Sequence, residues 1–124
     1  MPPAPLLGTG DRADDEDAEH GGEQPAASID VAFLCDAYHH LELPNTYLAD
    51  LRRALGPDGR SVVIDYDRTR PGTKAWMKEH IRADPGEFRR EIEAAWFVLS
   101  ASPAVLVENF FWVFELDDRV ARAR

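Results

Sequence analysis

Two short polar stretches carry the side chains best suited to chemistry. The first is Asp36-Ala-Tyr-His-His40, which directly follows the apolar run 31–35, and the second is Asp65-Tyr-Asp67, which follows the apolar residues 62–64. An imidazole titrates near neutral pH and can act as a base, while neighbouring carboxylates can bind a polar ligand. We therefore take both stretches as candidate parts of one site.

Each of these side chains also has a plain structural explanation. Asp36 suits a turn or a helix cap at the end of a strand as well as it suits a ligand contact. An aromatic ring at a sheet edge is as often packing as a pocket wall, and acids at strand ends are commonly only solvated. These explanations apply to Tyr38, Tyr66, Asp65 and Asp67.

The two adjacent histidines raise the question of a metal. Neighbouring residues on a helix or a strand diverge, so His39 and His40 are not expected to bind one ion together. Their spacing to Cys35 and Asp36 does not reproduce a standard zinc motif. No metal site is predicted.

The elements that must position these residues are two strands and the helix between them. Unbroken apolar runs predict buried strands at about 31–36 and 61–66. Between them, apolar residues at helical spacing follow Pro44 and end before Gly56-Pro57, with Pro57–Gly59 expected to form a tight turn. A strand–helix–strand unit makes the strands parallel, and ligands bind beyond the carboxyl ends of such strands. Both polar stretches should therefore meet on one edge.

The rest of the chain predicts two helices and an antiparallel strand pair. A short helix is expected at about 73–81, with Trp76 and His80 on one face. A second should begin at Asp84, with Pro85 in its first turn and Glu87 completing a capping box. The strands at about 97–100 and 109–116 have no helix between them and should pair antiparallel.

Composition divides the chain into an acidic leader, one domain and a tail. Residues 1–28 are expected to be disordered, 29–117 to form an α/β domain and 118–124 to fray. The formal net charge of −9 arises mostly in the first 30 residues, which hold eight acids and one base. Nucleic acid is not expected as a partner. No membrane span is predicted, and the single cysteine, Cys35, favours a reducing, cytoplasmic location.

These elements resemble the C-terminal half of a class I S-adenosylmethionine-dependent methyltransferase over roughly residues 29–116. The resemblance rests on Asp36–His40, on Leu51-Arg-Arg-Ala-Leu-Gly-Pro-Asp-Gly-Arg60, on Glu91-Ile-Glu-Ala-Ala-Trp-Phe97 and on the aromatic last strand. It implies a partial Rossmann-like sheet in which this chain supplies the fourth to seventh strands of the family order 3-2-1-4-5-7-6. The sequence departs from the family at Asp58 and at Trp96, where glycine is usual.

The resemblance also implies roles for the polar stretches. Asp36, Ala37 and Tyr38 would bind the cofactor S-adenosylmethionine, His39 and His40 would be catalytic, and Asp65, Tyr66 and Asp67 would line a substrate pocket. The glycine-rich half that grips the cofactor in the family would precede residue 29, where only the acidic leader stands. We therefore expect an incomplete methyltransferase that does not catalyse on its own.

A second interpretation is a non-catalytic association module. In the intact family fold the strand 31–35 is central, so in this chain it would form an exposed apolar edge, which recruits other strands. The expected partner is a second copy or a complementing chain that pairs through this edge. A truncated product without a selected function stays open as a third interpretation.

Overall fold

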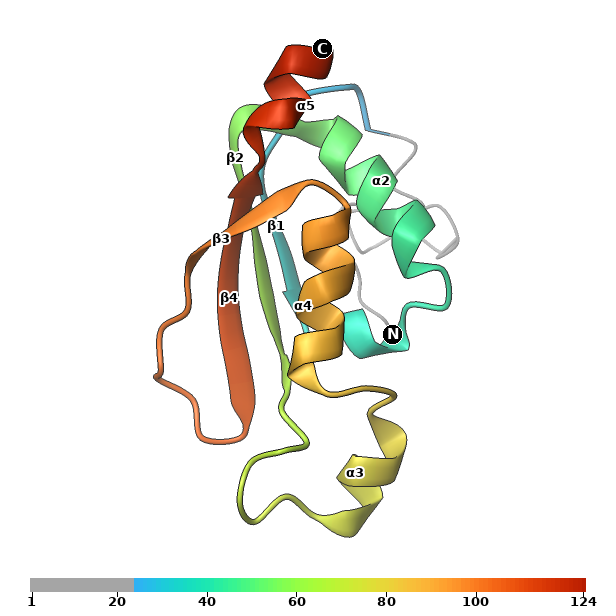
Figure 1. Cartoon of the computed structure of the whole chain (residues 1–124), viewed down its shortest axis with the longest axis vertical. Coiled ribbons are helices and arrows are strands. Elements are labelled where there is room, and N and C mark those ends of the chain that lie inside the picture. Colours follow the sequence, from blue (N-terminus) through green and yellow to red (C-terminus); the bar gives the residue numbers. More distant parts are fainter. Residues whose placement is uncertain (1–23) are drawn as a thin grey trace.

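A computed structural model describes residues 24–124, in which a four-stranded sheet carries helices on one face (Figure 1). The disorder predicted for the acidic leader therefore falls almost wholly outside the described residues. Residues 27 and 28 are held, since their backbone N–H groups donate to the carbonyls of Arg53 and Ala54. The elements in chain order are β1 Ile29–Cys35, η2 Tyr38–His40, α2 Pro44–Ala54, β2 Leu55–Tyr66, α3 Ala75–His80, α4 Pro85–Ala94, β3 Phe97–Ala101, β4 Asn109–Leu116 and α5 Asp118–Ala123.

The strand order β1-β2-β4-β3 confirms the predicted topology. β1 and β2 are parallel, with Cys35 opposite Ile64. β4 pairs antiparallel with both β2 and β3. The order corresponds to strands 4-5-7-6 of the family sheet that the sequence resembles, so the α/β, partial Rossmann-like class is confirmed.

β2 begins six residues earlier than predicted, because the expected turn at Pro57–Gly59 is an irregularity within the strand. Ile29 lies opposite Leu55, but Val31 lies opposite Arg60, so several residues of β2 bulge out between these two pairs. Gly59 is needed there, since a Cβ atom would come within 3.0 Å of the Gly56 carbonyl oxygen and 3.1 Å of the Ile29 one. The bulge joins helix to strand without a separate turn.

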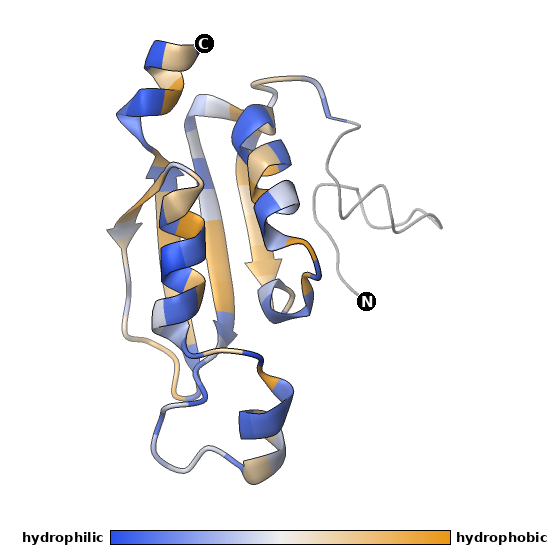
Figure 2. Cartoon of the chain, turned by 45° about the vertical axis from the view of Figure 1, so that its right-hand side comes forward, coloured by the Kyte–Doolittle hydropathy of each residue, from blue (hydrophilic) through white to orange (hydrophobic). Residues whose placement is uncertain are grey.

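The core lies between the sheet and the helices α2 and α4, which sit side by side on one face (Figures 1 and 2). Alternate residues of each strand point toward these helices, as expected of a pleated sheet. Apolar side chains at helical spacing on α2 and α4 complete the layer. The fully buried members include Leu51, Leu55, Phe88, Ile92, Phe97 and Phe114.

The opposite face of the sheet is apolar and partly open to solvent. Val31, Phe33 and Val98 are 60%, 46% and 47% exposed. β1 is also an edge strand, since β2 is its one partner within residues 24–124. The exposed edge predicted from the sequence is therefore present in the described part of the chain.

Helix α4 starts at the predicted place but without the predicted capping box. Asp84 is the N-cap residue, yet its side chain accepts no hydrogen bond from the helix backbone. The carboxylate instead accepts from Arg68 Nε at 2.6 Å, and Glu87 pairs with Arg90. The expectation was wrong because two arginines compete for the carboxylates that the box would use.

Helix α4 is followed by Trp96 in a left-handed conformation, at φ 73°. Glycine is the usual residue there, and a side chain in this conformation costs about 1–2 kcal/mol. The guanidinium carbons of Arg52 and Arg119 each lie 5.0 Å from the Trp96 ring centroid. Two such cation–π contacts contribute about 0.5–1 kcal/mol each at a partly exposed site, which offsets the strain.

Replacing Trp96 with glycine is therefore expected to change the free energy of unfolding by less than about 1 kcal/mol, because relieved strain offsets the lost ring contacts. Urea unfolding followed by circular dichroism measures this, with Trp96→Ala as the comparison that loses the ring and keeps the strain. A loss above about 2 kcal/mol in the glycine variant would show that ring packing outweighs the backbone.

The charged C-terminal residues are ordered, which corrects the predicted fraying of 118–124. They form helix α5, which begins at Asp118, and the carboxylate of the N-cap residue Asp117 accepts a hydrogen bond from the Arg119 backbone N–H. Val120 is buried against the rest of the chain. Arg124 Nη2 donates to the carbonyl oxygens of Arg52 and Leu55, both at 2.8 Å. The buried Val120 side chain and these hydrogen bonds hold a segment that the charged sequence predicted to be solvated.

Candidate functional site

The two polar stretches meet at the carboxyl ends of β1 and β2, as predicted. β1 ends at Cys35 and Asp36 turns away with φ 56°, a left-handed conformation that aspartate tolerates better than most residues. Its backbone N–H still donates to the Ile64 carbonyl at 2.8 Å, so the turn stays fastened to β2. Ala37, packed against the core, then leads into η2, which carries the tyrosine and the two histidines.

Asp65 clamps His39 through both carboxylate oxygens. Oδ1 lies 2.7 Å from His39 Nδ1, and Oδ2 accepts the His39 backbone N–H at 2.9 Å. Oδ1 also accepts the Tyr66 backbone N–H at 2.7 Å. Asp65 is fully buried, so it positions His39 and is closed to the direct substrate contact suggested by the sequence. Because an ionised carboxylate only accepts, His39 Nδ1 donates and Nε2 is left with its lone pair.

His40 and His80 complete a group of three imidazoles. The ring centroids of His39 and His40 are 4.0 Å apart, which corrects the expectation that adjacent histidines diverge. Within the short 3-10 turn η2 their side chains fold to the same side. His80, from α3, lies 5.1 Å from His39 and 5.5 Å from His40. Burial, with the charges of the two neighbouring histidines, lowers the pKa of His40.

Asp36 lies beside the cluster with its carboxylate partly open. Asn109 Nδ2 donates to Asp36 Oδ1 at 3.2 Å, which ties the first turn to the start of β4. Burial, reinforced by the nearby charge of Asp65, raises the pKa of Asp36. An acid with a raised pKa costs stability when ionised, so the folded state gains stability as the pH falls through that pKa.

Replacing Asp36 with asparagine is therefore expected to raise the melting temperature at pH 7. The amide keeps the acceptor for Asn109, tolerates the left-handed backbone and removes the ionised form. The gain should shrink as the pH falls and vanish near pH 3, below the ordinary aspartate pKa of about 3.9. Melting curves across this range test it, with the exposed Asp58→Asn as control; an equal gain at pH 3 and pH 7 would contradict the electrostatic cause.

Tyr38 points into the core, which differs from the pocket wall that the sequence suggested. Its ring is fully buried and packs edge-on against Phe88, with 5.3 Å between the two ring centroids. Its hydroxyl donates a hydrogen bond to Glu91 Oε1 at 2.7 Å. Arg82 binds both oxygens of the same carboxylate at 3.0 Å. Burial would raise the pKa of Glu91, but these hydrogen bonds outweigh it and lower that pKa. Tyr38 therefore holds η2 in place against α4 through its contacts with Phe88 and Glu91.

The two remaining predicted residues leave β2 in different directions. The Tyr66 ring is half-buried and lies 6.1 Å from that of His39, so it borders the cluster. Asp67 instead organises the following loop, where it accepts hydrogen bonds from Thr69 and from Arg70 Nε. Burial would raise the pKa of Asp67, but these bonds outweigh it and lower that pKa. Asp67 is thus engaged in the loop rather than in a pocket.

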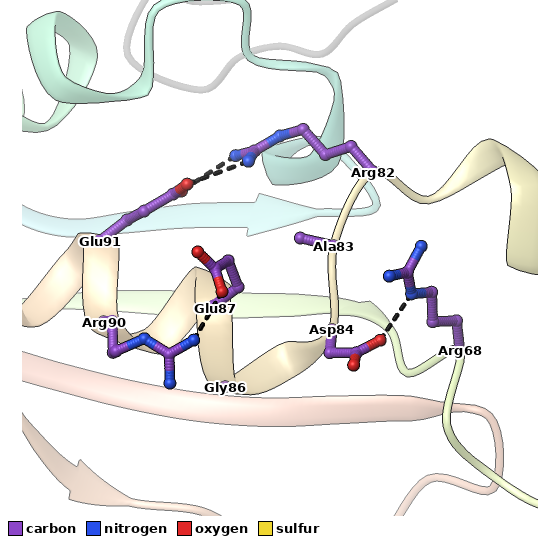
Figure 3. Close-up of a pocket in the computed structure, with 8 residues that line it drawn as sticks. All are labelled: Arg68, Arg82, Ala83, Asp84, Gly86, Glu87, Arg90 and Glu91. Atoms are coloured by element: carbon purple, nitrogen blue, oxygen red, sulfur yellow. Dashed lines mark hydrogen bonds and ion pairs between the residues drawn. The ribbon is translucent and has the colours of Figure 1, made fainter.

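A separate pocket of about 560 Å³ lies at the start of α4 (Figure 3). Its lining supplies three arginines with carboxylate partners: Arg68 with Asp84, Arg82 with Glu91 and Arg90 with Glu87. None of the eight predicted site residues lines it. Because these pairs satisfy the charges on its walls, the pocket lacks the uncompensated group that would mark a charged-ligand site.

The described residues fit one side of an adenosylmethionine site. Asp36 offers a partly open carboxylate at the end of β1, and the half-buried Tyr66 ring offers an aromatic surface. Within residues 24–124 no glycine-rich strand–turn–helix is present that would grip the cofactor from the other side. His80 and Asn109 were not predicted as site residues. Both are far along the chain from the other site residues, so no spacing in the sequence indicates that they lie close to them.

Comparison with protein families gives one match. The model of the family described as "Methyltransferase domain" matches residues 10–63, of which 10–23 lie outside the described part of the chain. The matched residues that the structure describes include β1, η2, α2 and most of β2. No curated protein matches the sequence.

Solved structures share the fold over most of the described chain. A SAM-dependent methyltransferase from Aquifex aeolicus has a TM-score of 0.69 at 20% identity, over 79% of this chain and 51% of that one. The 1,6-didemethyltoxoflavin-N1-methyltransferase of Burkholderia thailandensis, solved with S-adenosylhomocysteine, has a TM-score of 0.60 at 22% identity, over 77% and 47%. The TehB-like SAM-dependent methyltransferase of Corynebacterium glutamicum reaches 0.52 at 18%, over 77% and 53%.

The chain thus spans about half the length of each of these structures. Among the described residues, no helix has the length and apolar character needed to cross a bilayer. Strand order, fold neighbours and the family match together confirm the resemblance predicted from the sequence: the described residues have the fold of class I S-adenosylmethionine-dependent methyltransferases, of which they carry about half.

Proposed function

We propose that this chain contributes one half of an S-adenosylmethionine-dependent methyltransferase site and needs a complementing polypeptide for methyl transfer. The observation that carries the proposal is the clamp of Asp65 on His39 at the shared carboxyl ends of β1 and β2. In open α/β sheets this is where ligands bind. A buried carboxylate that orients an imidazole is also a common arrangement for proton transfer.

The proposed roles follow from the solvent exposure of each side chain in the site. Asp36 and Ala37, with the backbone at Tyr38, face the cofactor, which supplies a methyl group on a positively charged sulfur. His40 is exposed and has a lowered pKa, so at neutral pH it is uncharged and able to accept the proton that the methyl acceptor loses. His39, 97% buried in its side chain, holds His40 in place. The cytoplasm stays a prediction from the single cysteine.

Binding of S-adenosylhomocysteine to the full chain tests this proposal. A thermal-shift and calorimetric titration is expected to show binding that Asp36→Ala weakens and that Asp58→Ala, an exposed acid away from the site, leaves unchanged. Saturation at a hundred times the dissociation constant would stabilise the fold by about 2.7 kcal/mol. No heat and no thermal shift with the wild-type chain would remove cofactor binding by this chain.

The exposed edge supports a second candidate, a non-catalytic association module. Within residues 24–124, β1 pairs with β2 along one edge alone, and the open face of this apolar strand carries Val31 and Phe33. Such an edge pairs with another strand, from a second copy or from a complementing chain. This function needs no cofactor, so S-adenosylhomocysteine should leave the association unchanged.

Sedimentation at micromolar concentration separates the two candidates. The association module predicts an oligomer that Val31→Lys converts into a monomer, because a charged side chain on an edge strand opposes pairing. Val107→Lys is the matched control, since Val107 is 85% exposed and lies outside the sheet. A wild-type chain that stays monomeric at this concentration would contradict self-association.

A further inference from the structure

The three imidazoles beyond the carboxyl ends of β1 and β2 form a compact donor set. His39 and His40 come from η2 and His80 comes from α3, forty residues further along the chain. One ring nitrogen from each lies within 4.8 Å of the other two. We propose that this cluster binds a divalent transition-metal ion of the zinc class. A bound ion would occupy the lone pair of His40, so this site is an alternative to the base role proposed for His40 and does not depend on methyl transfer.

A bound ion requires shorter separations between the ring nitrogens than the 4.8 Å limit of this cluster. Tetrahedral ligands at about 2.0–2.1 Å from zinc lie about 3.3–3.4 Å from one another. The cluster reaches that separation by small side-chain rotations, which His40 and His80 can make because both are exposed. His39 is buried and hydrogen-bonded to Asp65, so its position is fixed. The two exposed rings of His40 and His80 would rotate toward it to share the ion.

Asp65 gives His39 the outer-shell partner that metal-binding histidines characteristically have. Asp65 Oδ1 accepts a hydrogen bond from His39 Nδ1 over 2.7 Å, which fixes the tautomer and leaves the lone pair of Nε2 free to bind a cation. Asp65 is fully buried and is held in place by the His39 and Tyr66 backbone N–H groups. These contacts also fix the orientation of the His39 ring.

Packing alone accounts less well for the two exposed rings. Within residues 24–124, neither His40 nor His80 forms an ion pair with a carboxylate, although both stand among other imidazoles. Protonated rings so close would repel each other, whereas a shared cation makes their proximity favourable. A set of three imidazoles favours zinc, copper, nickel or cobalt, while magnesium and calcium need oxygen ligands. Three protein ligands leave a fourth position open.

Calorimetric titration of the untagged full chain with ZnCl₂ tests the site. One ion is expected to bind per chain, and MgCl₂ is expected to give no heat. His80→Gln, an exposed change on a six-residue helix, should weaken zinc binding at least tenfold. Asp65→Asn should weaken it about 10–100-fold through the loss of the outer-shell partner. His20→Gln removes the one histidine outside the cluster and should leave the affinity unchanged.

Fluorescence gives a second readout at the site itself. The Trp76 ring lies 6.4 Å from His80 and is 58% exposed, so Co²⁺ in the cluster should quench it and excess Zn²⁺ should restore it. Trp76→Phe should remove most of this response. The proposal is overturned if the wild-type chain does not bind zinc, or if His80→Gln binds it as tightly as wild type. Neither measurement uses S-adenosylhomocysteine, so the result of the zinc test does not depend on the result of the cofactor-binding test.

Discussion

Truncating Phe88 to alanine is expected to lower the free energy of unfolding by about 3–5 kcal/mol. The side chain is fully buried at the centre of the contact between α4 and the sheet. The centroid of its ring lies 5.3 Å from that of Tyr38, which it contacts edge-on, and 6.4 Å from that of Phe110. The Arg82 guanidinium carbon lies 4.6 Å from the same centroid. The change leaves a large cavity and also loosens Tyr38, the anchor of η2. Urea unfolding followed by circular dichroism measures the loss.

Phe33→Ala is the matched control for this variant. The same side chain is removed, but Phe33 is 46% exposed on the open face of the sheet. Its removal is expected to cost about 1 kcal/mol, because about half of the side chain is already in water and no closed cavity forms. The comparison should be made at low protein concentration, where association through β1 does not contribute. Equal losses in the two variants would place the core elsewhere.

Replacing Asp65 with alanine is expected to cost about 2–4 kcal/mol, the second large effect. The change removes the acceptor of two backbone N–H groups, those of His39 and Tyr66, and of His39 Nδ1. Hydrogen bonds to a charged group contribute about 1.5–3 kcal/mol, and buried donors left without a partner add a desolvation cost. Loss of the clamp should also free η2, so amide hydrogen exchange at residues 38–40 should speed up more than elsewhere.

Asp58→Ala serves as the control for this effect, because Asp58 lies in the same strand and its side chain is exposed. Its removal should change the free energy of unfolding by no more than about 0.5 kcal/mol. Asp65→Asn should fall between the two, since the amide keeps one acceptor oxygen. A loss below about 1 kcal/mol for Asp65→Ala would mean that water replaces the carboxylate and that His39 is not clamped in solution.

Local pattern was enough to predict the sheet and the edge that carries the site. The unbroken apolar runs at 31–35 and 62–64 predicted two neighbouring strands, and a helix between them makes these strands parallel. The expectation that both faces are covered was wrong within residues 24–124, where Val31 and Phe33 lie on the open face. Alternation is likewise visible in the sequence of the last strand, where Phe110, Trp112 and Phe114 are buried on its inward face. Because these features depend on periodicity and on connection length, they are already determined at the level of sequence.

The tertiary structure alone decided what each polar side chain does. Only the packed fold could place Tyr38 under Phe88, pair Asp84 with Arg68 and order residues 118–123 as a helix. It also brought His80 to His39 and His40 across forty residues of chain. Such partners are chosen by three-dimensional proximity and by competition among donors and acceptors, neither of which leaves a spacing in the sequence. The strands of the sheet could therefore be predicted from the sequence. The roles of the polar side chains at its edge depend on contacts between segments that are distant in the chain.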